Sequence, residues 1–132
     1  MDPILELKGR LAKYPELRYT ETSYSIDVSP PSHDGFSVSF HVSANEYTVH
    51  FDGWHEHFRS AEEALDCFVL AFSGKARLAI TYRGSTAVKW VLEHLNETGW
   101  HADSEVTRFP TPFWKAKHVV YRQNPNLLRD NQ

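Results

Sequence analysis

The chain has few of the residues on which the most recognisable sites depend. Its 132 residues include one cysteine, Cys67, which excludes an internal disulfide and any zinc finger built from cysteines. No apolar run is long enough to span a membrane and no basic-then-apolar leader opens the chain, so we expect a cytoplasmic protein outside the membrane. The six glycines form no GxGxxG or GxxxxGKS/T phosphate loop, and there is no G-x-S-x-G turn to present a nucleophilic serine.

The composition is that of an ordinary globular domain, but the charge is unevenly distributed. With 41% hydrophobic and 23% charged residues, we expect one domain over residues 1–132, with 125–132 as a flexible tail. Residues 1–66 carry 12 acids against 5 Lys and Arg, whereas residues 67–132 carry 5 acids against 9. The halves of so small a domain should interleave in space, so this asymmetry indicates complementary strands, with an interaction surface as the alternative.

The first third of the chain indicates a helix followed by strands. Asp2 is suited to cap a helix and Pro3 to begin it; apolar residues then recur at helical spacing up to Tyr14, before Pro15 ends the pattern. From Leu17 onward the apolar residues recur at every second position instead, which is typical of strands. The inward-facing strand residues are expected to be Tyr24, Ile26 and Val28, followed by Phe36, Val38, Phe40 and Val42.

The segment "HFDGWHEHF", residues 50–58, predicts a hairpin with Asp52-Gly53 as its two-residue turn. In such a hairpin His50 lies opposite His55, with His57 on the same face, because successive pairs alternate sides. His41 extends this face if "SANE" forms a four-residue loop. The opposite, apolar face carries Val49, Phe51 and Trp54, with Glu56 as the exception.

His50, His55 and His57 are candidate ligands for zinc, since His-x-His beside a cross-strand histidine brings imidazoles within reach of one ion. Ligating histidines usually donate their second N–H to a carboxylate or a carbonyl. The predicted polar face offers only Ser, Thr and His from these strands, and Glu56 points the other way. We therefore expect a solvated histidine face and no cofactor, with zinc as the alternative and a pH-sensitive surface as a further option.

"SAEEALDCFVLAFSG" predicts a second helix, capped by Ser60 with Glu63 three residues later and ended by Gly74. Cys67 lies beside its apolar face without a basic or histidine partner, which favours a buried small hydrophobe over a nucleophile. "SHDG" places His33 beside Asp34, and there a turn is favoured over a catalytic pair. The expected core consists of Phe36, Val38, Phe40, Val49, Phe51, Leu65, Phe68 and Phe72.

Residues 76–124 indicate further strands. The stretch 86–95 fits helical and strand spacing alike; we predict a strand, because a helix would expose Trp90. The chain then turns at "NETG", passes through "FPTPF" and closes with a strand in "WKAKHVVYRQN", its basic residues outward. The succession "GWHEHF", "RLAITYRG", "KWVLEHL", "GW" and "FPTPFWKAKHVVYRQN" resembles a group of small bacterial proteins of unknown function over residues 45–124. The resemblance implies the strand around Trp90 and no site residue.

The C-terminal third also interleaves basic with aromatic residues, as single-strand binders do to hold phosphates and stack bases. The residues are Arg108, Lys115, Lys117, His118, Arg122 and Arg129, among Phe109, Phe113, Trp114 and Tyr121. Against nucleic acid stand a pI of about 6.2 and the position of Trp114 after a stiff apolar turn, which indicates core.

Together these patterns predict an α+β fold: a mostly antiparallel sheet of about six to eight strands with two helices, one packed on a sheet face. We expect a non-enzymatic binding or protein-interaction domain, with a protein partner or a second copy as in a homodimer. The alternatives are a histidine-site metal-binding protein with hydrolase activity, then a single-stranded nucleic-acid binder.

Overall fold

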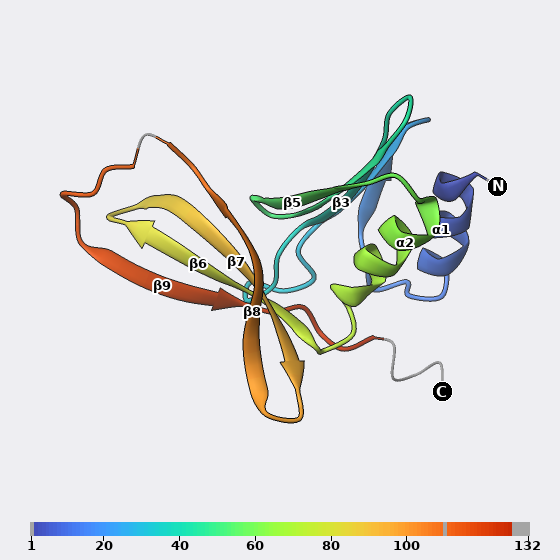
Figure 1. The fold of residues 1–132 in the computed structure, drawn as a ribbon. Helices are drawn as coiled ribbons and strands as arrows, with labels where there is room; N and C mark the ends of the chain where they lie inside the picture. Colours follow the sequence, from blue (N-terminus) through green and yellow to red (C-terminus); the bar gives the residue numbers. More distant parts are fainter. Residues whose placement is uncertain (1, 110, 128–132) are drawn as a thin grey trace.

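The computed structural model describes residues 2–109 and 111–127, which form two helices and nine strands in two antiparallel sheets (Figure 1). In chain order the elements are α1 (Pro3–Leu11), β1 (Tyr19–Glu21), β2 (Ser25–Val28), β3 (Val38–Val42), β4 (Tyr47–Phe51), β5 (Trp54–Phe58), α2 (Ala61–Leu70), β6 (Ala76–Arg83), β7 (Thr86–Asn96), β8 (Gly99–Thr107) and β9 (Lys117–Arg122). The α+β class, the antiparallel pairing and the two helices are confirmed. The strands are more numerous than expected, and they divide between two sheets.

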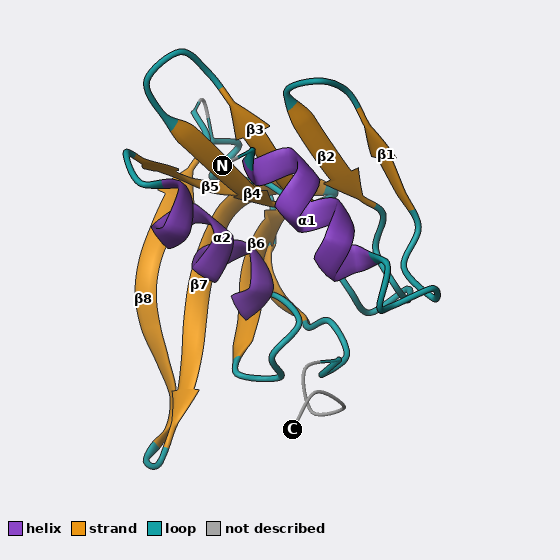
Figure 2. Ribbon diagram, turned by 90° about the vertical axis from the view of Figure 1, so that its right-hand side faces the viewer, coloured by secondary structure: helices purple, strands orange, loops and turns teal. Residues whose placement is uncertain are grey.

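The first sheet has the order β1-β2-β3-β4-β5, and both helices cover one of its faces (Figure 2). All eight residues expected in the core are buried, each with 4% or less of its surface exposed. Phe68 of α2 packs edge-to-face on Phe40 of β3, with ring centroids 6.3 Å apart. The alternation of apolar residues in the strands and the apolar stripe of α2 therefore meet in one core, as predicted.

The N-terminal caps of both helices lie where the sequence predicts them, but α2 ends at Leu70 with Ala71 as its C-cap, earlier than the predicted Gly74. Asp2 accepts a hydrogen bond from the Ile4 amide at 3.0 Å, and the Ser60 hydroxyl accepts one from the Glu63 amide at 3.3 Å. Helix α1 ends at Leu11, earlier than the apolar spacing indicated, because the Tyr14 amide bonds to the Leu11 carbonyl in a tighter turn.

The second sheet has the order β8-β7-β6-β9 and extends away from the helices (Figure 1). Residues 86–96 form strand β7, which confirms the prediction of a strand around Trp90. The Trp90 ring is 4% exposed and faces the first sheet's hairpin. Strand β9 pairs only with β6 in this order, so it is an edge of the sheet.

Two tryptophans join the sheets at the β4–β5 hairpin. Trp90 donates its ring N–H to Asp52 Oδ2 at 2.7 Å, and Trp54 donates to Ser104 Oγ at 2.9 Å. Asp52-Gly53 is the turn, as predicted, with Asp52 in the left-handed region at φ 54°. Gly53 allows close packing, since a Cβ atom there would lie 2.3 Å from the Trp90 ring.

The expectation for the start of β2 is wrong. Tyr24 is 69% exposed and Ser25 is buried, because β2 begins at Ser25, whose hydroxyl bonds to that of Thr22 at 2.9 Å.

In the segment expected to form a flexible tail, Leu127 packs on the core and its amide bonds to the Phe72 carbonyl. Residues 128–132 of that segment lie outside the described residues. In the described chain, no helix is long and apolar enough to cross a membrane.

The strands of the two halves of the chain do not interleave, contrary to expectation. Strands β1–β5 of the first sheet all come from the acid-rich half, whereas β6–β9 of the second sheet all come from residues 76–122 (Figure 1). The charge asymmetry of the sequence is therefore also an asymmetry in space. This removes the reason for preferring complementary strands over an interaction surface.

Candidate functional site

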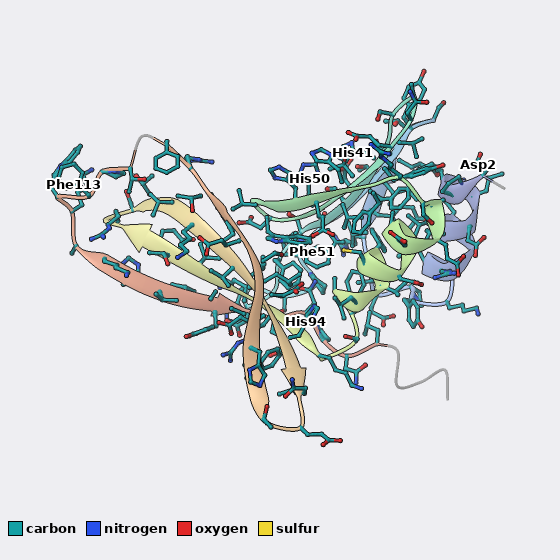
Figure 3. All side chains as sticks on the ribbon, viewed as in Figure 1. Asp2, His41, His50, Phe51, His94 and Phe113 are labelled. Atoms are coloured by element: carbon teal, nitrogen blue, oxygen red, sulfur yellow. The ribbon has the colours of Figure 1, made fainter. Side chains whose placement is uncertain are left out.

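Four histidines lie side by side across β3, β4 and β5, and we call them the histidine row: His41, His50, His55 and His57. The predicted pairing is confirmed, with His50 opposite His55 and Thr48 opposite His57. Consecutive ring centroids along the row are 5.3, 5.4 and 5.6 Å apart. Figure 3 shows His41 and His50 on the sheet face away from the helices, with Phe51 directed to the opposite side.

Two carboxylates that the sequence did not place beside the row border it at either end. Asp27 of β2 brings Oδ1 to 3.5 Å from His41 Nε2, and Glu46 brings Oε1 to 3.1 Å from His57 Nδ1. The alternation of Asp27 with buried Ile26 and Val28 indicates the face on which it lies, but only the pairing of β2 with β3 brings it to the histidines. Glu56, expected on the apolar face, is exposed because β5 is an edge strand.

The surroundings of the row perturb the titration of His50. Burial lowers the pKa of His50 below its ordinary value of 6.5; His41, His55 and His57 lower it further, and Asp27 raises it. Its Nδ1 is buried without a hydrogen-bond partner among the described residues. Within the same part of the chain, no group of three or more His, Cys, Asp or Glu side chains is arranged to hold a metal ion. The zinc ligand set His50, His55 and His57 stays a prediction.

A cleft of about 290 Å³ lies at the junction of the sheets, lined in part by His33, Phe36, Asp52, Tyr82 and Arg122. Two of its charged side chains already have structural partners. Arg122 donates to the His33 carbonyl at 2.8 Å, and Asp52 accepts from Trp90. His33 Nε2 lies 3.3 Å from Asp34 Oδ1, but both side chains are largely exposed in a loop. This arrangement holds the loop to β9 and offers no activated nucleophile.

Cys67 is partly buried against the core, as a small hydrophobic residue would be. Burial raises the pKa of its thiol to about 12, and the carboxylates of Glu56 and Asp103 add to the effect. The thiol therefore stays protonated at neutral pH, which makes it a poor nucleophile and metal ligand.

The most unusual surface lies at the far end of the second sheet. The loop between β8 and β9 carries Phe109, Phe113 and Trp114, which are 79%, 73% and 72% exposed. The core position expected for Trp114 is thus wrong: its ring packs edge-to-face on Phe113, at 5.4 Å, beyond the buried part of the sheet. Figure 3 shows Phe113 at the extremity of the molecule farthest from the helices.

Basic residues adjoin these rings. Lys115 belongs to the same loop, Lys117 begins β9, and Arg83 ends β6 beside it. Arg108 also belongs to the loop, but its guanidinium lies over the Trp90 ring, 5.5 Å from the ring centroid. The loop is tied to the sheet, since the Gly84 amide bonds to the Ala116 carbonyl at 2.8 Å and the Arg108 amide to the Val88 carbonyl at 2.8 Å. We call this surface the basic aromatic tip: Phe109, Phe113, Trp114, Arg83, Lys115 and Lys117. The sequence pattern named all of these except Arg83, which the β6–β9 pairing brings to the loop.

The outer face of the second sheet continues from the tip along the β9 edge. Lys117, Val119 and Tyr121 share this face, because they pair with Arg83, Thr81 and Ala79 of β6. Val119 and Tyr121 are 44% and 54% exposed. Further along, the guanidinium of Arg77 lies over the Tyr121 ring at 4.2 Å and over the Trp100 ring at 4.3 Å, which fixes their positions.

Comparison of the chain with protein-family models, with curated proteins and with solved structures found no match. The resemblance to small bacterial proteins stays a prediction.

Proposed function

We propose that the protein is a non-enzymatic binding domain that holds an acidic ligand at its basic aromatic tip. The observation that carries this proposal is the exposure of three large aromatic rings, each above 70%, on one loop at the end of a sheet. Large aromatics placed together in water lose the free energy that burial would provide, so such a group marks a contact surface.

The charge around the rings defines the kind of ligand. Three cations belong to the tip, and the sequence has no Asp or Glu between residues 67 and 92 or between 106 and 129. The four acids of the described second sheet and its turn, Glu93, Glu97, Asp103 and Glu105, all belong to the β7–β8 hairpin. The tip is thus the part of a net negative protein at which a negative ligand is favoured.

We also propose where the domain is located and from what kind of organism it comes. A cytoplasmic location suits a chain whose one cysteine is a protonated thiol packed against the core, and a bacterial origin follows from the resemblance. A protein partner, or a second copy of this chain, is the alternative occupant of the same surface.

Retention on immobilised heparin, a polyanion, tests the proposal directly. We expect the protein to bind at low salt despite its net charge of −3, and the Lys115→Gln/Lys117→Gln variant to elute at clearly lower salt. The matched control is Lys8→Gln/Lys13→Gln in and after α1, which removes the same charge from the other sheet's helical face.

Two results would contradict the proposal. One is a protein that flows through heparin at low salt. The other is an equal change in elution for the control and the tip variant. Light scattering of the unbound protein reports whether a second copy occupies the tip: a dimer that Trp114→Ala separates into monomers would replace the acidic ligand by self-association.

A further inference from the structure

We propose that the ligand of the basic aromatic tip is a single-stranded nucleic acid, which continues from the tip along the β9 edge. This inference rests on the proposed function and names the ligand class. Bases stack on Phe109, Phe113 and Trp114, while the surrounding cations hold the phosphates.

The kind of apolar residue at the tip favours stacking. Between Val106 and Val119, every large apolar residue is aromatic, and no Leu, Ile, Val or Met occurs. Flat rings complement the flat faces of unpaired bases, whereas a loop that inserts into lipid gains as much from aliphatic side chains. Phe113 and Trp114 meet edge-to-face with their planes at 82°, so their rings present differently directed faces.

The cations are of the type and in the place that phosphates require. Arg83 supplies a planar guanidinium group, which matches phosphate oxygens, and Lys115 and Lys117 supply point charges. Arg83 Nη1 lies 3.4 Å from the Lys115 carbonyl, so the β6 cation is positioned at the loop. Among the described residues, none of these three cations takes part in an ion pair.

The β9 edge provides a path for an extended chain. Six residues of strand, Lys117–Arg122, run for about 20 Å at roughly 3.3 Å per residue. Lys117 stands at the tip end of this path and Tyr121 near the other end, with its ring held in place by Arg77. A linear polyanion with stackable groups fits such a path better than a compact anion does.

Fluorescence anisotropy with a labelled oligothymidine of about 15 nucleotides, near the upper site size of a small single-strand-binding domain, tests the inference. We expect saturable binding at low salt. We expect Trp114→Ala to weaken it by about fivefold to a hundredfold, the loss found when a stacking ring is removed. Trp114→Phe, which keeps a ring, should retain most of the affinity. The matched control is Tyr24→Ala, an equally exposed aromatic on the other sheet, which should bind as the wild type does.

Salt dependence gives a second, independent readout. If all three tip cations neutralise phosphates, log Kobs should fall against log salt with a slope of about −2.1, at roughly −0.7 per contact. Lys115→Gln/Lys117→Gln should reduce that slope by about 1.4, whereas Trp114→Ala should leave it unchanged. Melting temperatures equal to that of the wild type establish that each variant is folded. An oligouridine arm compares RNA with DNA.

The outcomes separate this inference from the proposed function. Heparin retention that depends on Lys115 and Lys117, without oligonucleotide binding, overturns the nucleic-acid assignment and leaves the binding domain standing. If the protein binds neither heparin nor the oligonucleotide, both the nucleic-acid assignment and the proposed binding function are overturned. Binding to phosphatidylserine vesicles that Trp114→Ala abolishes, with no oligonucleotide binding, would assign the tip to a lipid surface instead. Duplex DNA bound as tightly as the single strand would also contradict stacking on the exposed rings.

Discussion

Replacing Gly53 by alanine is expected to lower the free energy of unfolding by about 2.5–4.5 kcal/mol, because the two sheets meet at this residue. An added Cβ would lie 2.3 Å from the Trp90 ring, whereas ordinary contact begins at 3.4 Å. The ring must therefore retreat by about 1 Å, although it is 96% buried and bonded to Asp52 at 2.7 Å. Overpacking of this kind costs about 1–3 kcal/mol, and a weakened hydrogen bond to a charged group adds about 1.5 kcal/mol or more.

Urea unfolding followed by far-UV circular dichroism measures the change, since it does not depend on tryptophan emission. Gly9→Ala is the matched control: it is the same substitution in α1, where an added Cβ meets nothing within 4 Å. There alanine should stabilise the protein by about 0.5–1 kcal/mol, because it is the better helix former. The two substitutions are thus expected to act in opposite directions.

A double-mutant cycle with Trp90→Ala decides whether the close approach is the cause. In the Trp90→Ala background the ring is absent, so Gly53→Ala should cost little. Gly53 does not have a positive φ, and alanine therefore meets no backbone strain there. The reasoning is refuted if Gly53→Ala is as stable as the wild type, or if its cost is the same with and without the Trp90 ring.

Three further changes test other parts of the structure. Phe68→Ala should cost about 3–5 kcal/mol in urea unfolding, because the ring is 1% exposed between α2 and β3; a change below 1 kcal/mol would contradict that packing. Acidification should destabilise the protein as pH falls below 6.5, because the lowered pKa of His50 means that the unfolded chain binds the proton more tightly. His50→Gln should make the loss of melting temperature between pH 7 and pH 5 shallower, whereas His33→Gln, at a largely exposed site, should not. Protein purified without a His tag should contain no stoichiometric zinc and keep its melting temperature with a chelator; a full equivalent of zinc that His55→Ala removes would instead establish the metal site.

The hairpin 47–58 shows what local pattern can determine. Apolar residues alternate on both sides of Asp52-Gly53, and a two-residue turn leaves one register, so the pairing of His50 with His55 followed from the sequence alone. The capped helix α2 was predictable for a similar reason, since Ser60, Glu63 and the apolar stripe all lie within one segment.

Features that depend on distant pairing were not predictable in this way. Asp27 reaches His41 only because β2 pairs with β3. Arg83 reaches the tip only because β6 pairs with β9, and Arg83 and its partner Lys117 are more than 30 residues apart in the chain. The period of a strand shows which side chains share a face but not which strand lies beside it. The exposure of Trp114 was missed because an aromatic residue that follows a proline-containing turn has the same local pattern in a core as at a surface.

The separation of acidic and basic halves gives the molecule a permanent electric dipole. The half with a net charge of −7 forms the strands of one sheet, and the half with +4 forms those of the other, so the positive pole lies toward the tip. A negatively charged chain that diffuses nearby is turned toward that pole before contact, which raises its association rate at low ionic strength. The same dipole favours head-to-tail attraction between copies in dilute buffer. Salt near 0.15 M, with a Debye length of about 8 Å, suppresses both effects beyond the immediate surface.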